Sequence, residues 1–590
     1  MLNNTYKLFV QKYLNTKNDY GKDSHLAKDM VSKRMDIQQS LMPDYLGFGI
    51  KCTTFLFMIQ MFLRKLILNQ NEIQIINSNR HSNFSFFKKL IRFHDSIYEI
   101  ANVNEKIDYK RSYKSRKMDN KQYDYIVVGS GPGGSVCARE IQKAGLSVCV
   151  LESGYDFSDF EVEEFSYNQM LNQYKNAGIT TTLGGINITY VEGETVGGGS
   201  EINSGLYHRT PKNILEYWKK KFHFIDSKHD SIMDYFPIIE KKLYISYFPK
   251  NKIPKASIKL KEGAKNLGWE VQEVPRWFKY ASDGSCDGQK MTMSKTYLKE
   301  YIDKGGTIQD QAKVQEIKKI NEYWQVDFKT PNGKRNVKAK NIVLSAGTIG
   351  TAQILKSSGL SKNAGKTFKM HPTIKVVALF DEKVNEDNMG VPVHQVKEFS
   401  PDFSFGCSIS SKPYLKVAML DHYESFGIVE EKWEHMAIYY CMIVPEGSGT
   451  IKKLPFFRDP FVRYSLTKND KITLARGLRE LCRLLISAGA KTLYPSINRS
   501  PIISTLNDLN LLPECIESLK TNLMTVHLFS SCPIGERKQL CVADSYGKVF
   551  GHDGLYISDS SILPSAPGVN PQGSIMALSH RNIKRALENQ

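Results

Sequence analysis

The alternation of apolar and polar residues divides the middle of the chain into short strands and helices. Tyr125–Val128 and Val148–Leu151 are continuous apolar runs, which are typical of buried parallel strands. Ser135–Lys143 lies between them, has helix-compatible residues and ends near Gly145. This order predicts a strand–helix–strand unit over residues 122–154.

Later segments repeat both patterns. Residues 341–360 contain an apolar strand, a turn at Gly347 and a helix-like run that begins near Ile349. Residues 435–451 are rich in β-branched and aromatic residues, which favour strands. Residues 471–490 carry apolar positions at helical spacing. The pattern therefore predicts a mixed α/β protein.

An apolar stretch near the N-terminus has a different character. YLGFGIKCTTFLFMIQMFL, residues 45–63, is interrupted by Lys51 and Gln60 and followed by Arg64 and Lys65. A membrane-spanning helix needs about 20 apolar residues with few or no charges, so this stretch is marginal. Three interpretations stay open: a helix buried against the main body, an interfacial helix that anchors the protein to a membrane, and a transmembrane span.

Composition and charge narrow the class of protein. The chain has 590 residues, 41% hydrophobic and 24% charged, which indicates a soluble protein of two or more domains. The formal net charge is +19, and residues 1–120 hold 20 Lys and Arg against 11 Asp and Glu. Such a basic extension fits an anionic membrane or a solvated surface. Nucleic acid is not expected as a partner, because no zinc-finger, helix-turn-helix or RNP pattern accompanies the charge.

Cysteine usage and the first residues bear on the compartment. The ten cysteines form no CxxC pair, so no metal site is expected, and they are typical of reduced core residues. The N-terminal residues lack the apolar region and cleavage site of a secretory signal. We expect a cytoplasmic location, with peripheral attachment to the inner face of a membrane if residues 45–65 form an anchor. The basic stretch at 111–121 is interpreted as a linker.

A glycine-rich turn gives the first indication of chemistry. GSGPGG follows the first strand and places Gly129, Gly131 and Gly134 at GxGxxG spacing, and Glu152 ends the second strand. Gly129 permits the tight turn, Gly131 lets backbone N–H groups approach a pyrophosphate, and Gly134 lets the helix pack closely on the strand. The helix N-terminus faces the phosphate charge, and Glu152 is expected to hydrogen-bond ribose hydroxyls. The motif predicts a dinucleotide site without distinguishing NAD from FAD.

Three further blocks follow this motif along the chain. They are TVGGGSEINSGLYHRTP (residues 195–211), NIVLSAGTIGTAQILKSSGL (residues 341–360) and ADSYGKVFGHDGLYISDSSILPSAPGVNPQGSIMALSHRNIKRAL (residues 543–587). With these blocks, residues 122–590 resemble the glucose-methanol-choline (GMC) family of FAD-dependent oxidoreductases. The ordered set is far more specific than a single glycine motif.

The resemblance implies an α/β fold with a doubly wound, Rossmann-like FAD-binding domain assembled from non-contiguous segments. This domain is expected to comprise residues 121–215, 290–365 and 525–590. An α+β substrate domain on an antiparallel sheet is expected from residues 216–289 and 366–524. Residues 1–120 lie outside the resemblance and are expected to form a mostly helical or irregular N-terminal extension.

The resemblance also implies contacts with FAD beyond the glycine turn. The matching positions are Gly198, Gly199, Ser200, Asn203, Val314, Asp559, Ser560 and Gln572. Val314 matches a position that contacts the adenine half through its backbone. Some relatives attach FAD covalently to a histidine just before the asparagine. Ile202 occupies that place here, so the FAD is expected to be non-covalent.

Two residues match the catalytic positions of the family. His527 in HLFSSCPIG and Asn570 in GVNPQGS correspond to a histidine and a second His or Asn beside flavin N5. Alcohol oxidation sends a hydride from carbon to the flavin and releases a proton from oxygen. The resemblance implies that His527 is the general base, because imidazole titrates near neutrality. Asn570 is then the partner that hydrogen-bonds the developing alkoxide.

The resemblance implies an alcohol substrate without specifying its type. The HLFSSC and GVNP forms resemble the cholesterol-oxidase and long-chain-alcohol branch, which favours an apolar alcohol, although sugars and polyols stay open. The electron acceptor stays open between O2, a quinone and a protein. The alternative is a flavin-binding, membrane-associated protein with non-alcohol chemistry or no catalysis. His371, His552 and His580 are interpreted as structural or packing residues.

Overall fold

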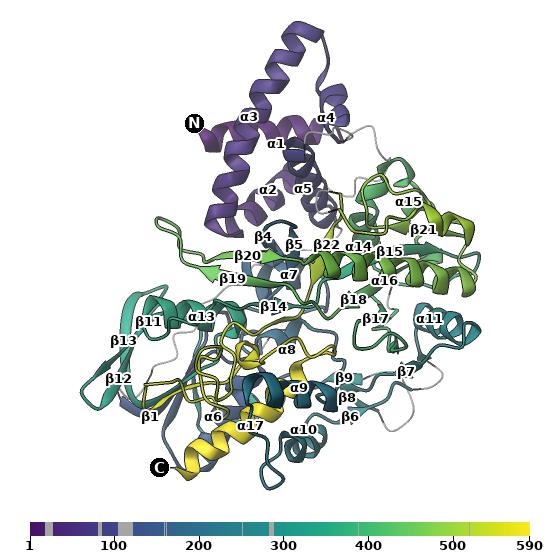
Figure 1. The fold of residues 1–590 in the computed structure, drawn as a ribbon. Coiled ribbons are helices and arrows are strands. Elements are labelled where there is room, and N and C mark those ends of the chain that lie inside the picture. Colours follow the sequence, from purple (N-terminus) through teal and green to yellow (C-terminus); the bar gives the residue numbers. More distant parts are fainter. Residues whose placement is uncertain are drawn as a thin grey trace.

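The computed structural model describes residues 1–17, 28–80, 85–103, 118, 122–158, 160, 162–249, 252–281, 288–387, 389–517 and 520–589. Apart from Met118, the predicted linker at 111–121 lies outside these residues. The described chain forms a helical N-terminal bundle, residues 1–103, and a body, residues 122–589, built on two large sheets (Figure 1). The mixed α/β class predicted from the sequence is confirmed.

The N-terminal bundle has its own hydrophobic core. Its helices are α1 (Leu2–Asn15), α2 (Lys28–Leu41), α3 (Asp44–Leu68), α4 (Glu72–Arg80) and α5 (Ser85–Ala101). Phe9, Phe57 and Ile91 are fully buried at the centre of this core, which is separate from that of the body. The bundle contacts the body through α5, α2 and the start of α3. Arg92 of α5 forms an ion pair with Asp421 at 2.6 Å, and Asp44 of α3 accepts from Arg458 N at 2.7 Å.

Helix α3 contains the predicted apolar stretch and extends it at the C-terminal end. It packs on α1 and α5 through one face, whereas its C-terminal half projects beyond the body (Figure 1). Only 22% of its most apolar window is buried, so the interpretation of a helix buried against the main body is wrong. By length and composition, α3 is long and apolar enough to cross a membrane.

The first sheet of the body carries the predicted strand–helix–strand unit. Its strands are β1 (Gln122–Val128), β2 (Val148–Leu151), β10 (Thr307–Gln309), β11 (Lys313–Ile320), β12 (Tyr323–Thr330), β13 (Gly333–Leu344) and β24 (Leu555–Ile557). Strands β10, β2, β1, β13 and β24 run parallel, while β11–β13 form an antiparallel meander. The parallel order requires crossover connections, and α6 (Pro132–Lys143) makes the one between β1 and β2.

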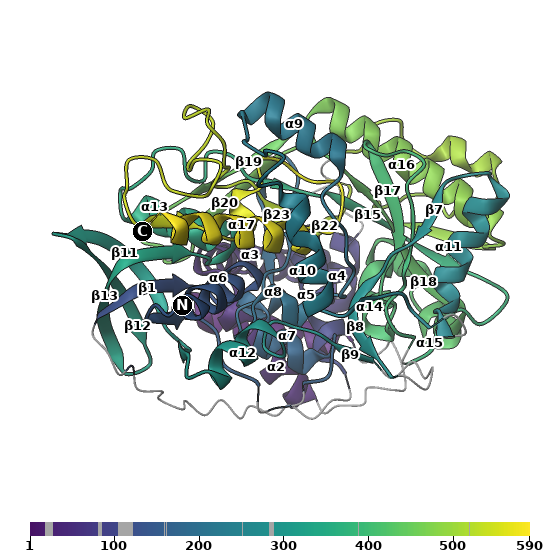
Figure 2. The same cartoon turned by 90° about the horizontal axis from the view of Figure 1, so that it is seen from below.

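Helices on this sheet bring its sequence blocks together. Helix α13 (Gly347–Ser357) follows β13, as the pattern at residues 341–360 predicts. The C-terminal helix α17 (Gln572–Glu588) packs against α6, and Figure 2 shows the two side by side. The glycine turn and the C-terminal block are thus neighbours, although about 440 residues of sequence separate them.

The second sheet is mainly antiparallel. Its strands are β3 (Thr180–Thr181), β5 (Ile188–Tyr190), β7 (Val271–Glu273), β15 (Thr373–Leu379), β16 (His394–Val396), β17 (Phe403–Cys407), β18 (Met436–Ile443), β21 (Thr492–Pro495) and β22 (Leu523–Thr525). Helix α16 (Lys468–Ser487), which the pattern at 471–490 predicts, packs on one face. Strands β3 and β5 come from within residues 121–215, so that stretch contributes to both sheets.

Candidate active site

One continuous cavity lies between the two sheets. Its volume is about 550 Å³, within the range of small-molecule and cofactor sites. The glycine turn after β1 and the segment 198–199 line it on the side of the first sheet. His527, which follows β22, and Asn570, which precedes α17, line another part of the cavity wall. Segments far apart in the sequence therefore face one space.

The three glycines of the turn have different surroundings. A Cβ on Gly129, whose φ is +101°, would lie 2.1 Å from the Ser345 carbonyl oxygen. A Cβ on Gly134 would lie 2.0 Å from the Gly129 carbonyl oxygen, so this glycine serves helix packing and does not line the cavity. A Cβ on Gly131 would meet no atom closer than 4.0 Å, and Gly131 faces the cavity.

Glu152 lies at the cavity wall, at the end of β2. Its carboxylate accepts hydrogen bonds from the backbone N–H of Ser130 at 2.9 Å and of Gly154 at 2.8 Å. The Ser130 hydroxyl donates a third bond at 2.7 Å. Burial raises the pKa of Glu152. The carboxylate is held rigidly and keeps lone pairs for a further donor from the cavity.

The segment 197–203 forms the adjoining wall. Gly198 has a φ of +57°, and a Cβ there would lie 2.7 Å from the Gly131 Cα, so the two glycine segments touch backbone to backbone. Asn203 lines the cavity and donates to Gln572 Oε1 at 2.7 Å. Ser200 points away from the cavity, where its hydroxyl donates to Gly197 O at 2.8 Å.

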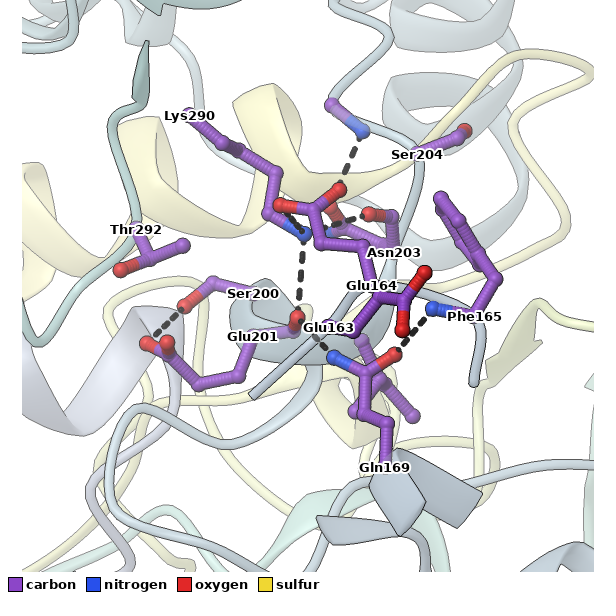
Figure 3. Close-up of polar contacts among 12 residues, drawn as sticks. Glu163, Glu164, Phe165, Gln169, Ser200, Glu201, Asn203, Ser204, Lys290 and Thr292 are labelled. Atoms are coloured by element: carbon purple, nitrogen blue, oxygen red, sulfur yellow. Dashed lines mark hydrogen bonds and ion pairs between the residues drawn. The ribbon is translucent and has the colours of Figure 1, made fainter. Parts of the chain in front are cut away.

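A polar cluster fixes this segment from behind (Figure 3). Lys290 donates to the carbonyl oxygens of Glu201 and Asn203, both at 3.0 Å, and pairs with Glu164 at 3.0 Å. The Gln169 amide donates to the same Glu201 carbonyl at 3.2 Å. Sequence reasoning missed this cluster because its members are scattered along the chain and form no motif.

The remaining predicted contacts also reach the cavity. Gly199, Val314, Asp559, Ser560 and Gln572 line it. Burial raises the pKa of Asp559, whose carboxylate accepts from Gly347 N at 3.0 Å and from the Thr351 hydroxyl at 2.5 Å. These bonds tie the start of α13 to the C-terminal block.

The residues present fit FAD. At one end, a glycine backbone without side chains and the N-terminus of α6 suit a pyrophosphate. Glu152 offers acceptors for ribose hydroxyls beside this turn. The cavity continues without interruption to His527 and Asn570, which leaves room for a ring system next to them. Among the described residues, no cluster of His, Cys, Asp and Glu has the arrangement of a metal site.

His527 and Asn570 contact each other at the cavity wall. The distance from His527 Nε2 to Asn570 Nδ2 is 3.3 Å, and Asn570 Oδ1 accepts from Gln395 at 3.3 Å. Burial, and secondarily the positive charge of Lys397, lowers the pKa of His527 to about 4. The imidazole is therefore neutral at physiological pH.

His371 extends this pair into a hydrogen-bond chain. Its Nε2 accepts from the backbone N–H of Gly568 at 3.0 Å, and its Nδ1 lies 3.1 Å from His527 Nδ1. Burial lowers the pKa of His371 well below its usual value, so the ring is neutral and carries its hydrogen on Nδ1. His527 thus faces two competing donors, because His371 Nδ1–H points at its Nδ1 and the Asn570 amide nitrogen, which only donates, lies at its Nε2. A neutral imidazole has one acceptor nitrogen, so it can accept only one of these two hydrogen bonds at a time.

This chain changes the interpretation of His371. The sequence pattern indicates a structural residue there, and the structure adds direct contact with the predicted catalytic histidine. The outcome for the other two histidines is simpler. His580 bonds the Tyr297 hydroxyl at 2.8 Å, and His552 bonds the Leu360 carbonyl at 2.8 Å. Neither lines the cavity.

Comparison with known proteins places these features in a family. Two family models of the GMC oxidoreductases match residues 123–373 and 450–579. An uncharacterised GMC-type oxidoreductase of Sinorhizobium fredii is 32% identical over 79% of this chain and 94% of its own length. A long-chain-alcohol oxidase of Arabidopsis thaliana is 27% identical over 78% of this chain and 67% of its own length.

A solved structure extends the likeness to the fold alone. The crystal structure of a pyridoxine 4-oxidase from Mesorbium loti superposes with a TM-score of 0.60 at 15% identity. The superposition covers 78% of this chain and 98% of that protein. The body therefore shares its overall fold with that protein.

Proposed function

This chain belongs to the GMC oxidoreductase family, and we propose that it is an FAD-dependent oxidoreductase acting on the CH–OH group of an alcohol. The observation that carries the proposal is the position of His527 and Asn570. They contact each other at 3.3 Å on the wall of the cavity that also holds the glycine turn. A proton-transfer group and a neutral hydrogen-bonding amide are what removal of a hydroxyl proton requires.

FAD would be held by the glycine turn, Glu152, segment 198–203 and the residues around Asp559, and when bound it supplies a hydride acceptor. No residue at position 202 offers a covalent link, because Ile202 lacks a nucleophile. We therefore expect a cofactor that acid precipitation of the protein releases. A yellow precipitate with a colourless supernatant would contradict non-covalent binding.

His527 is proposed to take the hydroxyl proton at Nε2, with Asn570 hydrogen-bonding the oxygen. Its neutral state at physiological pH suits this role. His527 can accept at Nε2 only when its hydrogen is on Nδ1, which is also the state in which it can accept from Asn570 Nδ2. In that state His371 Nδ1 must accept from His527, so His371 gives up the bond from Gly568.

A second role for His527 follows from the other arrangement of the same chain. When His371 Nδ1 donates to His527 Nδ1, the Nε2–H group of His527 can donate to the substrate oxygen and stabilise developing negative charge there. Asn570 serves either role, since a carboxamide can donate to or accept from the oxygen. The two roles differ in whether His527 must exchange a proton.

Matched substitutions separate these roles. Flavin bleaching is followed anaerobically by stopped flow, with absorbance giving the FAD content of each variant. A general base predicts that His527→Ala and His527→Gln both slow bleaching, by about 10²–10⁴-fold. A donor predicts that His527→Gln, which can still donate, keeps most of the rate. Unchanged bleaching in His527→Ala would contradict both roles.

The substrate is proposed to be an apolar alcohol. Val391, Ile409, Met442 and Met524 line the cavity away from the glycine turn. Such a wall gains free energy by burying a hydrocarbon chain. The first screen therefore compares fatty alcohols and sterols with polyols and sugars, and bleaching by polar alcohols alone would contradict this class. With FAD bound, failure of every alcohol would favour non-alcohol flavin chemistry, and reoxidation with O2, a quinone or a protein acceptor identifies the electron acceptor.

We also propose that α3 rests on the inner surface of a membrane, with the body in the cytoplasm. Its exposed side chains include Phe62, at 66%, and Leu66, at 70% exposed. Arg64 and Lys65 lie among them and complement anionic lipid headgroups. An apolar face edged by basic residues is typical of interfacial helices.

A further inference from the structure

One half-buried lysine faces the cavity on the side of the second sheet. Lys375 lies on β15, where alternate residues point to opposite faces. Ile374 and Val376 are fully buried in the main core, whereas Thr373 and Lys375 line the cavity. The chain therefore directs the lysine side chain into the space where a substrate lies.

Within the part of the chain that the structure describes, the Lys375 ammonium has no hydrogen-bond or ion-pair partner. Lys175, another lysine of the cavity wall, pairs with Glu192 at 3.4 Å. The buried Lys290 pairs with Glu164 at 3.0 Å. Burial alone lowers the pKa of Lys375 to about 8, with no contribution from a neighbouring charge. The Lys375 ammonium is therefore a cation without a neighbouring anion.

The surroundings of Lys375 are otherwise apolar or neutral. On the neighbouring strand β18, Tyr440 lies opposite Lys375 and Met442 lies opposite Thr373, and both line the cavity. Neither carries a charge at physiological pH. The unpaired positive charge of Lys375 on this part of the wall matches one negative charge at the end of an otherwise apolar molecule.

The position of Lys375 separates it from the reacting end. Thr373 pairs with Met524, which precedes His527 by three residues. Lys375 is two residues further along β15, a distance of about 7 Å along the strand. A substrate whose hydroxyl reaches His527 would thus meet the ammonium through a different part of its length.

We propose that Lys375 binds a carboxylate at the far end of the alcohol substrate, so that the enzyme prefers long-chain ω-hydroxy carboxylic acids. This inference rests on the proposed alcohol oxidation. A carboxylate is favoured over a phosphate because its one charge is matched by one ammonium, whereas a phosphate dianion would keep an uncompensated charge in an apolar wall. Lys375 acts in specificity and takes no part in proton transfer.

The kinetic test uses the FAD-loaded full-length protein and three substrates of equal chain length. They are 12-hydroxydodecanoate, its methyl ester and 1-dodecanol. We expect the wild type to prefer the carboxylate by about 10–100-fold in kcat/KM, the range for a hydrogen bond to a charged group. Lys375→Met should abolish this preference by raising KM for the carboxylate and not for its methyl ester. Lys375→Arg should retain it, and Lys299→Met, on the exposed face of α12 (Tyr297–Asp303), is the surface control.

An equilibrium measurement keeps the inference testable apart from catalysis. Dodecanoate has no hydroxyl, so its binding to the holoenzyme, followed by calorimetry, does not depend on alcohol oxidation. We expect the Kd for dodecanoate to rise at least about tenfold in Lys375→Met. If no alcohol bleaches the flavin but this rise occurs, the proposed function fails while the carboxylate site stands.

Four results would overturn the carboxylate site. The first is equal use of the carboxylate and its methyl ester by the wild type. The second is an equal loss of activity on all three substrates in Lys375→Met, because that would indicate a contact with the cofactor. The third is an unchanged Kd for dodecanoate in this variant. The fourth is tighter binding of dodecyl phosphate than of dodecanoate by the wild type.

Discussion

The N-terminal bundle contains a buried lysine and the body a half-buried one at its cavity wall, and only the first has acidic partners. In the bundle, the Lys17 ammonium lies 3.0 Å from Asp95 and 3.8 Å from Glu99. Burial lowers the pKa of Lys17, but these carboxylates outweigh burial and raise it overall. In the body, Lys375 has no such partner among the described residues, and its pKa falls to about 8.

The difference separates a structural charge from a functional one. A buried ion pair that is also hydrogen-bonded holds its helices in one arrangement, because removing one member leaves the other unpaired. A half-buried charge without a partner reduces stability, and it lies in the body at the wall of a cavity. The same contrast applies to apolar surface: the body covers its core, whereas α3 of the bundle leaves a face uncovered.

The largest expected effect is the loss of stability when a member of the buried charge cluster of the bundle is removed. Asp95 also accepts from Tyr13 at 2.6 Å and from Arg80 at 2.8 Å, so Asp95→Ala should destabilise the bundle by about 3–5 kcal/mol. Hydrogen exchange of residues 1–103 measures the bundle. All five tryptophans lie in the body, so their fluorescence should show little change. Equal protection in Asp95→Ala and in the exposed control Asp29→Ala would contradict a structural role for the cluster.

A second prediction concerns the cofactor, which should stabilise the body and not the bundle. At 100 times its Kd, FAD adds about 2.7 kcal/mol to the stability of the domain that binds it. Gly131→Ala should remove this gain, because its methyl group would occupy the cavity while clashing with no protein atom. Tryptophan-detected melting with and without FAD measures the difference. A normal FAD-induced shift in Gly131→Ala would show that the turn does not hold the cofactor.

The uncovered face of α3 gives the third prediction. Phe62→Glu with Leu66→Glu should weaken binding to anionic liposomes by at least about tenfold, because two apolar contacts are lost and two like charges are introduced. The matched control replaces Leu506 and Leu511, which are 57% and 59% exposed on the body. Co-sedimentation at two salt concentrations measures both pairs. If both pairs sediment alike, α3 is not the membrane contact.

The smallest expected effect is the response to acid. Burial lowers the pKa of His94 in the bundle and of His394, His527 and His580 in the body to about 4, against about 6.5 when unfolded. The unfolded chain therefore binds more protons between these values. The contribution of these histidines to the free energy of unfolding is present above pH 6.5 and is lost as the pH drops towards 4.

Each of these histidines should remove about 0.8 kcal/mol between pH 7.5 and 6. The body, with more of them, should lose more stability than the bundle, which hydrogen exchange of the two regions at both pH values would show. His94→Phe should flatten the response of the bundle alone. A bundle whose stability responds to pH as steeply as that of the body would contradict the assignment of the acid response to these histidines.

The predictability of the two regions from sequence also differed. Strand β2 was predicted residue for residue, and β1 and α6 within three residues at their starts, because apolar period and glycine punctuation are local signals. The helices of the bundle other than α3 were predicted only as a class, since their sequence carries no motif. The face that α3 leaves uncovered depends on which helices pack against it, and no local pattern encodes that.

The residues of the candidate site also differ in how far the sequence predicted them. The resemblance brought forward His527, Asn570 and the glycine turn, and the structure places them around one cavity. Ser200 was expected as a cofactor contact, but its hydroxyl bonds the Gly197 carbonyl and does not line the cavity. Gly134 lets the helix pack closely on the strand, as its place in the motif predicts. The contact of His371 with His527 and the lysines at 290 and 375 had no sequence signal, because their partners, or the lack of them, depend on distant segments.

The sequence by itself determined the order of the strands and helices around the glycine turn and the family to which the chain belongs. Periodicity and backbone freedom act between residues close in the chain, so they can be read from it. Only the tertiary structure decided that His371 and Asn570 both meet His527 and that Lys375 faces the cavity without an anion. Those properties arise from electrostatic contacts and burial between segments hundreds of residues apart, which exist only once the two sheets have packed together.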